Sequence, residues 1–444
     1  MLTREDFTGV LRNAIAGLGF DQDAAMVTFP IELFLVDSDI SPVEARFEEF
    51  VQGLTAWEPA VKTPGLVRPP GPRVEGATHA EAAARMNQLF LEKLWGDGLP
   101  LVPPDQATVA WVLQGTDRDP ADVVGQVLPR GGIATVETLA VTLAMAGGRP
   151  EYLPVLIAAM EAMLDPAMEH DKWQATSAST YPVVIVNGPV REQIRLNTGF
   201  GLLGPDPRHP AGASIGRALR LLQQNVGGAL PGTGTMAVFG AMRYTNAVFG
   251  EDEEGLPPGW APLAAERYGR AADVSSVTVY PATGATNILR RGVGKETLEE
   301  EARASLLRIA GYLRSPNAHY IWGWSQGTPG AVLIPRVVAR QLAEQGWSKA
   351  SVREFLWEHS AIPLAELRET EIVRWMEQST DPAIMAGLKD PWPIAREPEG
   401  ILLAVAGGGH PTHAFWMQAM APAVANREVQ LPRAWERLIA ARAG

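Results

Sequence analysis

Cysteine is absent from this 444-residue chain. The absence excludes disulfides, thiolate zinc sites, iron–sulfur clusters, thiolate-ligated haem and a cysteine nucleophile supplied by the chain itself. Long apolar runs are absent as well, since no stretch reaches the ~20 residues that a membrane-spanning helix needs. The first residues have early acids and lack the apolar region of a signal peptide. We therefore expect a cytoplasmic protein with no membrane partner.

An excess of basic residues is also missing. The chain has 38 Lys and Arg against 50 Asp and Glu, which gives a net charge of −12. Nucleic acids and anionic membranes bind basic faces, so this balance argues against both as partners. The composition, 46% hydrophobic and 20% charged, is typical of a globular protein. Its 13 tryptophans and its apolar, Ala-rich helices suggest more apolar surface than one core uses, which favours a homo-oligomer.

The length allows two or three domains, or one large domain. Residues 61–77 contain four prolines and are the best candidate for a boundary. We expect an N-terminal helical region over 1–65, a core domain over 78–290 and a helical insertion over 291–390. Residues 391–444 are predicted to complete the core with a strand, a glycine loop and a helix. No internal repeat is visible.

Three strands are predicted, over 183–187, 275–280 and 401–406, and the last is a continuous apolar run as in a strand covered on both faces. Two Ala-rich segments, 134–147 and 151–164, are apolar all round, as is typical of buried helices. The predicted fold class is α/β or α+β, a mainly helical chain packed around a modest mixed sheet.

Glycines and histidines follow the last predicted strand. Gly407, Gly408 and Gly409 precede His410 and His413, and we expect a helix to begin after them. Glycine amides and a helix N-terminus favour an anion, and ligands bind at the carboxyl ends of strands in open α/β sheets. The histidines could act as general acid or base, or as half of a metal site. A tight turn with one capping histidine is the structural alternative.

Polar residues in the middle of the chain are candidates for substrate binding. Arg130 stands before two glycines and a helix start, where an arginine is suited to grip a carboxylate. Gln174 and Thr176 belong to a dense polar stretch before the first predicted strand, and Asn187 and Asn197 follow in turns. The asparagines are turn formers as well, so a structural role stays open for both.

Two carboxylates complete the catalytic candidates. Asp97 lies in a Gly-Asp-Gly turn, which can also be purely structural. Glu137 lies in the first turn of a predicted helix, where it suits the helix dipole. The acidic run over 251–254 is predicted to be a solvated loop. The GFGLLG run over 199–204 follows no strand and precedes Pro205, so we reject a dinucleotide-binding fingerprint.

Several phrases occur in an order that resembles one bacterial family. They are WGDGLP from residue 95, PRGGIATVETLAVTLAMAGGRPEYLPV from residue 129, then QAT, VIVNGP, NTGFGLLGP, ASIGRALRL and AVAGGGHPTHAF. Over about 85–280 and 390–420 the chain is similar to proteins related to, or encoded near, the UGSC-motif (seleno)proteins. Where relatives often read AGCRPEY, this chain has Gly148 in place of the cysteine. The resemblance identifies relatives without assigning a reaction. It implies that any redox role would borrow a thiol or selenol from elsewhere.

The leading hypothesis is an enzyme that cleaves a carbon–heteroatom bond in a small polar, anionic metabolite, by lyase or hydrolase chemistry. Arg130 would hold the anionic group, the polar residues would orient the substrate, a histidine would move a proton and the glycine amides would stabilise negative charge. One alternative is a subunit of a redox system whose partner protein supplies a Cys or Sec. Another is a His-ligated metalloenzyme. No cofactor is predicted, and a metal is not favoured because no HExxH motif or carboxylate triad accompanies the histidines.

Overall fold

The computed structural model describes residues 1–17, 19–20, 25–35, 37–58, 71–289, 297–315, 328–369, 389–421 and 423–442. Much of the predicted connector over 61–77 therefore lies outside the described residues, as do parts of the segment 291–390. Among the described residues, no helix combines the length and the apolar character needed to cross a membrane.

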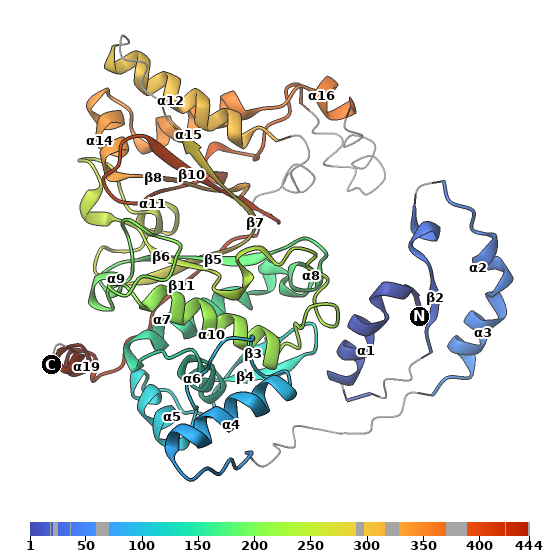
Figure 1. Ribbon diagram of the computed structural model, residues 1–444. Coiled ribbons are helices and arrows are strands. Elements are labelled where there is room, and N and C mark those ends of the chain that lie inside the picture. The colour runs from blue at the N-terminus through green and yellow to red at the C-terminus, as the bar shows by residue number, and fades with distance from the viewer. Residues whose placement is uncertain are drawn as a thin grey trace.

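A small N-terminal unit stands beside the body of the molecule (Figure 1). Its two short strands pair in parallel. On α1, the Asn13 amide donates a hydrogen bond of 3.1 Å to the carbonyl of Gly228 in the body. The elements of this unit are β1 (Leu2–Arg4), α1 (Thr8–Gly17), β2 (Val27–Phe29), α2 (Ser41–Ala45) and α3 (Phe47–Thr55).

One mixed seven-stranded sheet organises the body, in the order β6-β5-β7-β10-β8-β9, with β11 beside the first half of β7. Two neighbouring pairs, β5 with β6 and β8 with β9, are parallel, and the other pairs are antiparallel. The mixed α/β fold class predicted from the sequence is confirmed. The strands are β5 (Tyr181–Asn187), β6 (Ala247–Gly250), β7 (Ser276–Leu289), β8 (Gly330–Ile334), β9 (Leu402–Val405), β10 (His413–Ala419) and β11 (Ala425–Glu428).

The sheet consists of two lobes that repeat one arrangement. In each lobe a central strand, β5 or β8, pairs in parallel with the next strand and antiparallel with the one after it. An equivalent hydrogen bond extends each parallel pair by one residue. Glu251 N donates to Val186 O at 3.0 Å in the first lobe, and Ala406 N donates to Ile334 O at 2.9 Å in the second. The lobes meet where β7 and β10 pair antiparallel, as a local two-fold axis requires. The described chain thus contains an internal structural repeat that the sequence does not reveal.

The body is built in four layers, because the sheet curls until its lobes pack face to face. Alternate residues of β5, such as Val183 and Ile185, belong to the apolar layer between the lobes, together with residues of β8, β9 and β10. The other face of the first lobe packs on α6 (Val136–Met145), α7 (Leu153–Met163) and α10 (Ala211–Asn225). The outer face of the second lobe packs on helices above it in Figure 1, namely α12 (Leu298–Leu313), α14 (Arg336–Glu344) and α15 (Lys349–Ser360).

Local sequence signals explain several of these boundaries. Thr135 and Thr138 form a capping box that starts α6, and Thr297 does the same with Glu300 for α12. The remaining α-helices in the described part of the body are α4 (His79–Glu92), α5 (Gln106–Val112), α8 (His170–Ala175), α9 (Val190–Gln193), α11 (Leu263–Tyr268), α16 (Leu364–Glu369) and α19 (Trp435–Arg442). A hairpin of β3 (Val123–Val127) and β4 (Gly132–Thr135) precedes α6.

Two expectations from the sequence change in the structure. The segment after the glycine loop is a strand, β10, and the predicted helix there is wrong. The segment 291–390, expected as a helical insertion, supplies β8 to the interior of the main sheet.

Candidate functional site

The carboxyl ends of the two parallel strand pairs meet at a junction between the lobes. The amide of Asp252, after β6, donates to the carbonyl of Val405 on β9 at 2.7 Å. The amide of Gly407, after β9, donates to the carbonyl of Thr198 at 2.9 Å. Loops from both lobes are therefore joined at the edge of the sheet where ligands bind in open α/β folds.

Buried charges hold this junction together. The Glu251 carboxylate is fully buried and accepts from Asn187 Nδ2 at 2.7 Å, from the amide of Leu263 at 2.6 Å and from Lys349 Nζ at 3.3 Å. Asp252, also buried, accepts two hydrogen bonds of 2.7 Å from Arg336. The prediction of a solvated acidic loop is wrong for these two residues, because their partners come from distant parts of the chain.

Two of the predicted binding residues have structural partners at the junction. Asn187 Nδ2 also donates to Glu253 at 3.0 Å, so its amide orients the acidic loop. Asn197 Oδ1 accepts from the amide of Gly199 at 2.8 Å, and Nδ2 donates to the carbonyl of Phe200 at 3.0 Å. These bonds close a turn, which is the structural role that the sequence left open for asparagine.

The glycine loop turns tightly against this asparagine turn. Gly407 and Gly408 have φ values of +99° and +84°, and a Cβ on Gly408 would lie 3.2 Å from the Phe200 ring and amide. Among the described residues, neither Gly408 N–H nor Gly409 N–H has a hydrogen-bond acceptor. The first helical residue of α14, Arg336, donates its amide to the carbonyl of Gly408 at 3.2 Å. The loop thus places two available N–H groups beside a helix N-terminus, an arrangement that favours an anion.

The two histidines of the loop share one hydroxyl group. Thr412 Oγ1 lies 2.9 Å from Nδ1 of His410 and 2.9 Å from Nδ1 of His413. The two rings lie 5.3 Å apart between centroids. His410 is exposed and His413 is half-buried at the start of β10. Thr412 is not among the residues predicted from the sequence, although its place between the two histidines was a usable signal.

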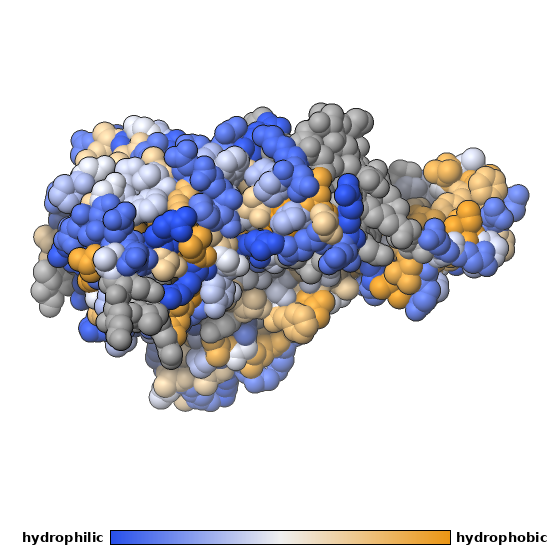
Figure 2. All heavy atoms as spheres, turned by 90° about the horizontal axis from the view of Figure 1, so that it is seen from above, coloured by the Kyte–Doolittle hydropathy of each residue, from blue (hydrophilic) through white to orange (hydrophobic). Residues whose placement is uncertain are grey.

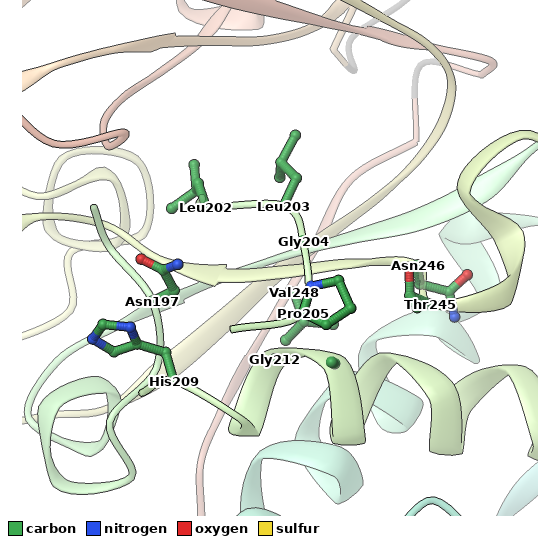
Figure 3. Close-up of a pocket in the computed structure, with 11 residues that line it drawn as sticks. Asn197, Leu202, Leu203, Gly204, Pro205, His209, Gly212, Thr245, Asn246 and Val248 are labelled. Carbon is green, nitrogen blue, oxygen red and sulfur yellow. The ribbon is translucent and has the colours of Figure 1, made fainter. Parts of the chain in front are cut away.

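A shallow hollow lies on the other side of the asparagine turn (Figure 3). It is lined by Asn197, Leu202, Leu203 and His209 among others. Nδ1 of His209 lies 2.8 Å from Oδ2 of Asp206. The hydrogen bond to His209 is the largest of several that lower the pKa of Asp206 far below its usual value.

Three predicted binding residues lie away from the junction. Gln174 and Thr176 precede β5, whereas the junction begins where β5 ends, and six residue steps along that strand span about 20 Å. Arg130 is exposed on the β3–β4 hairpin, where its amide donates to the carbonyl of Gly227 at 2.9 Å. The composite site predicted from the sequence, with a histidine beside Gln174, is therefore not assembled.

The two predicted carboxylates also have structural surroundings. Asp97 receives bonds of 2.7 and 2.9 Å from Arg217. Burial raises the pKa of Asp97, but the hydrogen bonds and charge of Arg217 outweigh burial and lower it overall. Glu137 lies half-buried in the first turn of α6, as expected from the helix dipole.

Within the described residues, no group of three or more His, Asp or Glu side chains could hold a metal ion. Comparisons of the chain with protein-family models, with curated proteins and with solved structures gave no match.

Proposed function

We propose that this chain is an enzyme that cleaves or rearranges a carbon–heteroatom bond in a small polar, anionic metabolite, at the loop of residues 407–413. The observation that carries the proposal is the pair of histidines bridged by Thr412. The reaction would be of lyase or hydrolase type, with acid/base catalysis by the imidazoles and stabilisation of negative charge by glycine amides.

The shared hydroxyl gives the two neutral imidazoles opposite tautomers. Thr412 N–H points to Nδ1 of His410 at 3.4 Å, which makes that nitrogen an acceptor and leaves the ring proton of His410 on Nε2. The single hydroxyl hydrogen of Thr412 then also points to His410, and Oγ1 accepts from Nδ1–H of His413. His413 keeps a bare Nε2 that can accept a proton, while Nε2–H of His410 can donate one. This assignment follows from the hydrogen-bond network.

The neighbouring loop supplies the electrostatic half of the mechanism. The N–H groups of Gly408 and Gly409, with the N-terminal end of α14, favour negative charge next to the imidazoles. In this proposal they take the anion-holding role that the sequence suggested for Arg130. The Arg336 side chain is half-exposed and ion-paired with Asp252, so it stabilises the junction between the two lobes.

Substitution of the bridged residues tests the proposal. His410→Ala, His413→Ala and Thr412→Val would be compared with wild type by NMR-monitored consumption of a panel of small carboxylates and phosphate esters. We expect each histidine variant to lose about 100-fold or more of the turnover. His79→Ala, at an exposed histidine on α4, is the control and should retain the wild-type turnover. Full turnover in both histidine variants would refute the proposal, and elemental analysis of the same wild-type preparation tests the metalloenzyme alternative.

A further inference from the structure

Two arginines are buried at the amino end of β5, on the far side of the first lobe from the junction. Arg220 on α10 is 6% exposed and Arg243 is 5% exposed. Arg243 donates to the carbonyl of Thr180 at 2.8 Å, to Oγ1 of Thr235 at 2.5 Å and to the carbonyl of Gln174 at 3.4 Å. Arg220 donates to the carbonyl of Ala229 at 3.0 Å. Every one of these partners is neutral.

Neither guanidinium forms an ion pair with a carboxylate in the described part of the chain. Burial and then the charge of Arg220 lower the pKa of Arg243 to about 10, so it remains cationic at neutral pH. The charge of Asp97 acts on Arg220, but Asp97 is already ion-paired with Arg217. The two buried positive charges are therefore uncompensated, which is unfavourable unless an anion joins them.

Unpartnered polar atoms surround the same two arginines. Gln174 Nε2, Thr180 Oγ1, Gln223 Oε1 and both ring nitrogens of His170 are buried, and none has a hydrogen-bond partner among the residues that the structure describes. Gln223 Nε2 donates to Gln174 Oε1 at 2.7 Å, which ties α10 to α8 within the cluster. Most of the idle groups can donate a hydrogen bond, so the missing partner is rich in acceptor atoms.

A glycine-rich loop covers the cluster. Gly228 has φ +70°, and a Cβ there would lie 2.8 Å from Arg130 Cβ and 2.7 Å from Asn13 Nδ2. A Cβ on Gly234 would lie 1.7 Å from the carbonyl oxygen of Gly228. The loop over 227–235 therefore folds tightly between the buried arginines and the N-terminal helix α1, and only glycine fits at these points.

We propose that Arg220 and Arg243, with the buried side chains of Gln174 and Thr180, form a binding site for a small oxyanion, either a carboxylate or a phosphate. Such a ligand compensates the guanidinium charges and accepts hydrogen bonds from the idle donors, Gln174 Nε2 and Thr180 Oγ1. The site lies at the opposite end of β5 from the histidine loop and does not depend on the function proposed there.

Titration calorimetry at constant ionic strength tests this site with inorganic phosphate and with acetate, using chloride as the reference anion. We expect wild type to bind one oxyanion per chain, and Arg220→Gln or Arg243→Gln to weaken that binding at least about tenfold. Arg353→Gln is the matched control, because Arg353 is equally buried but ion-paired with Glu266 at 2.6 Å, and it should leave binding unchanged. Tighter binding of phosphate assigns a phosphoryl ligand, and tighter binding of acetate assigns a carboxylate.

A crystal of the wild-type protein soaked in selenate keeps the test decisive if an arginine variant fails to fold. Anomalous density between Arg220 and Arg243 supports the site. Absence of density there, or equal oxyanion affinity in wild type and both folded variants, overturns it.

Discussion

At the scale of single residues, Glu251 has the most partners of the buried carboxylates. Replacement by alanine removes one of the two carboxylates paired with the buried Lys349 charge, and it leaves the amide of Leu263 without its acceptor. We therefore expect Glu251→Ala to lower the free energy of unfolding by about 3–5 kcal/mol in urea titrations. Glu428→Ala removes an exposed ion pair with Arg270 and should change the free energy of unfolding by less than about 1 kcal/mol. Equal losses in the two variants would contradict this account.

His170 makes stability depend on pH. Burial and then the charge of Arg243 lower its pKa to about 3 in the folded chain, against 6.5 for an unperturbed histidine. The unfolded state therefore binds the proton first, and stability falls as pH decreases from about 6.5 toward 3, by up to about 1.4 kcal/mol per pH unit.

Urea unfolding at pH 7, 6 and 5 measures this slope. His170→Leu should flatten the pH dependence relative to wild type, since it removes the group whose protonation differs between the two states. His79→Gln, at an exposed position, should leave the slope as it is. Identical slopes in all three proteins would show that His170 does not titrate in this way.

At the scale of elements, α10 packs against β6 and the residues just before it more closely than a side chain permits. A Cβ on Gly216 would lie 1.8 Å from the carbonyl oxygen of Thr245, and one on Gly212 would lie 2.5 Å from that of Val248. Alanine favours an isolated helix over glycine by about 1 kcal/mol, but here the helix would have to move away from the sheet. The close packing therefore requires glycine at these positions, although glycine is a poor helix former.

Gly216→Ala should accordingly destabilise the protein by about 1–3 kcal/mol, the usual range for overpacking. Gly311→Ala in α12 is the matched control, because no atom lies within 4 Å of its added Cβ, and it should stabilise by up to about 1 kcal/mol. Thermal unfolding of both variants gives the comparison. A stabilising Gly216→Ala would mean that α10 does not lie against the carbonyl of Thr245.

The strand β10 shows why an element can be mistaken from the sequence. The apolar run His413–Ala419 is short, and short buried runs do not separate helix from strand by periodicity. Its pairing with both β7 and β8 decides the matter, and those partners lie far away in the sequence.

At the scale of the whole molecule, the N-terminal unit exposes large apolar side chains, seen at the right of Figure 2. Leu54 is 83% exposed and Phe47 is 62% exposed on α3, and Leu35 and Ile40 lie nearby in the sequence with similar exposure. Exposed apolar patches are typical of interaction surfaces. The homo-oligomer expected from the composition would use this surface.

Light scattering after size exclusion measures the prediction. The double variant Phe47→Glu with Leu54→Glu should have a lower mass than wild type, because charge is placed in the buried contact. Leu298→Glu, at a comparably exposed residue on α12, should keep the wild-type mass. The same mass for all three proteins would show that the N-terminal unit does not form the contact between subunits.

The sequence by itself determined the local properties of this protein. It indicated the mixed α/β class, the buried helices α6 and α7, and the core of β5, β7 and β9. These features depend on hydrophobic periodicity and apolar runs, which can be recognised from residues close together in the sequence. It also indicated the turns at Asn187 and Asn197 and the tight loop of Gly407–Gly409.

Only the tertiary structure decided which polar groups meet. The repeat of the two lobes, the burial of Glu251 and the separation of Gln174 from the histidine loop depend on pairings between distant strands. Arg220 could not be recognised either, because Ser214, Arg217, Arg220 and Gln224 recur at helical spacing like a stripe that faces solvent, and only the packing buries Arg220. Charges are placed by long-range contacts, and these are not encoded in any short window of residues.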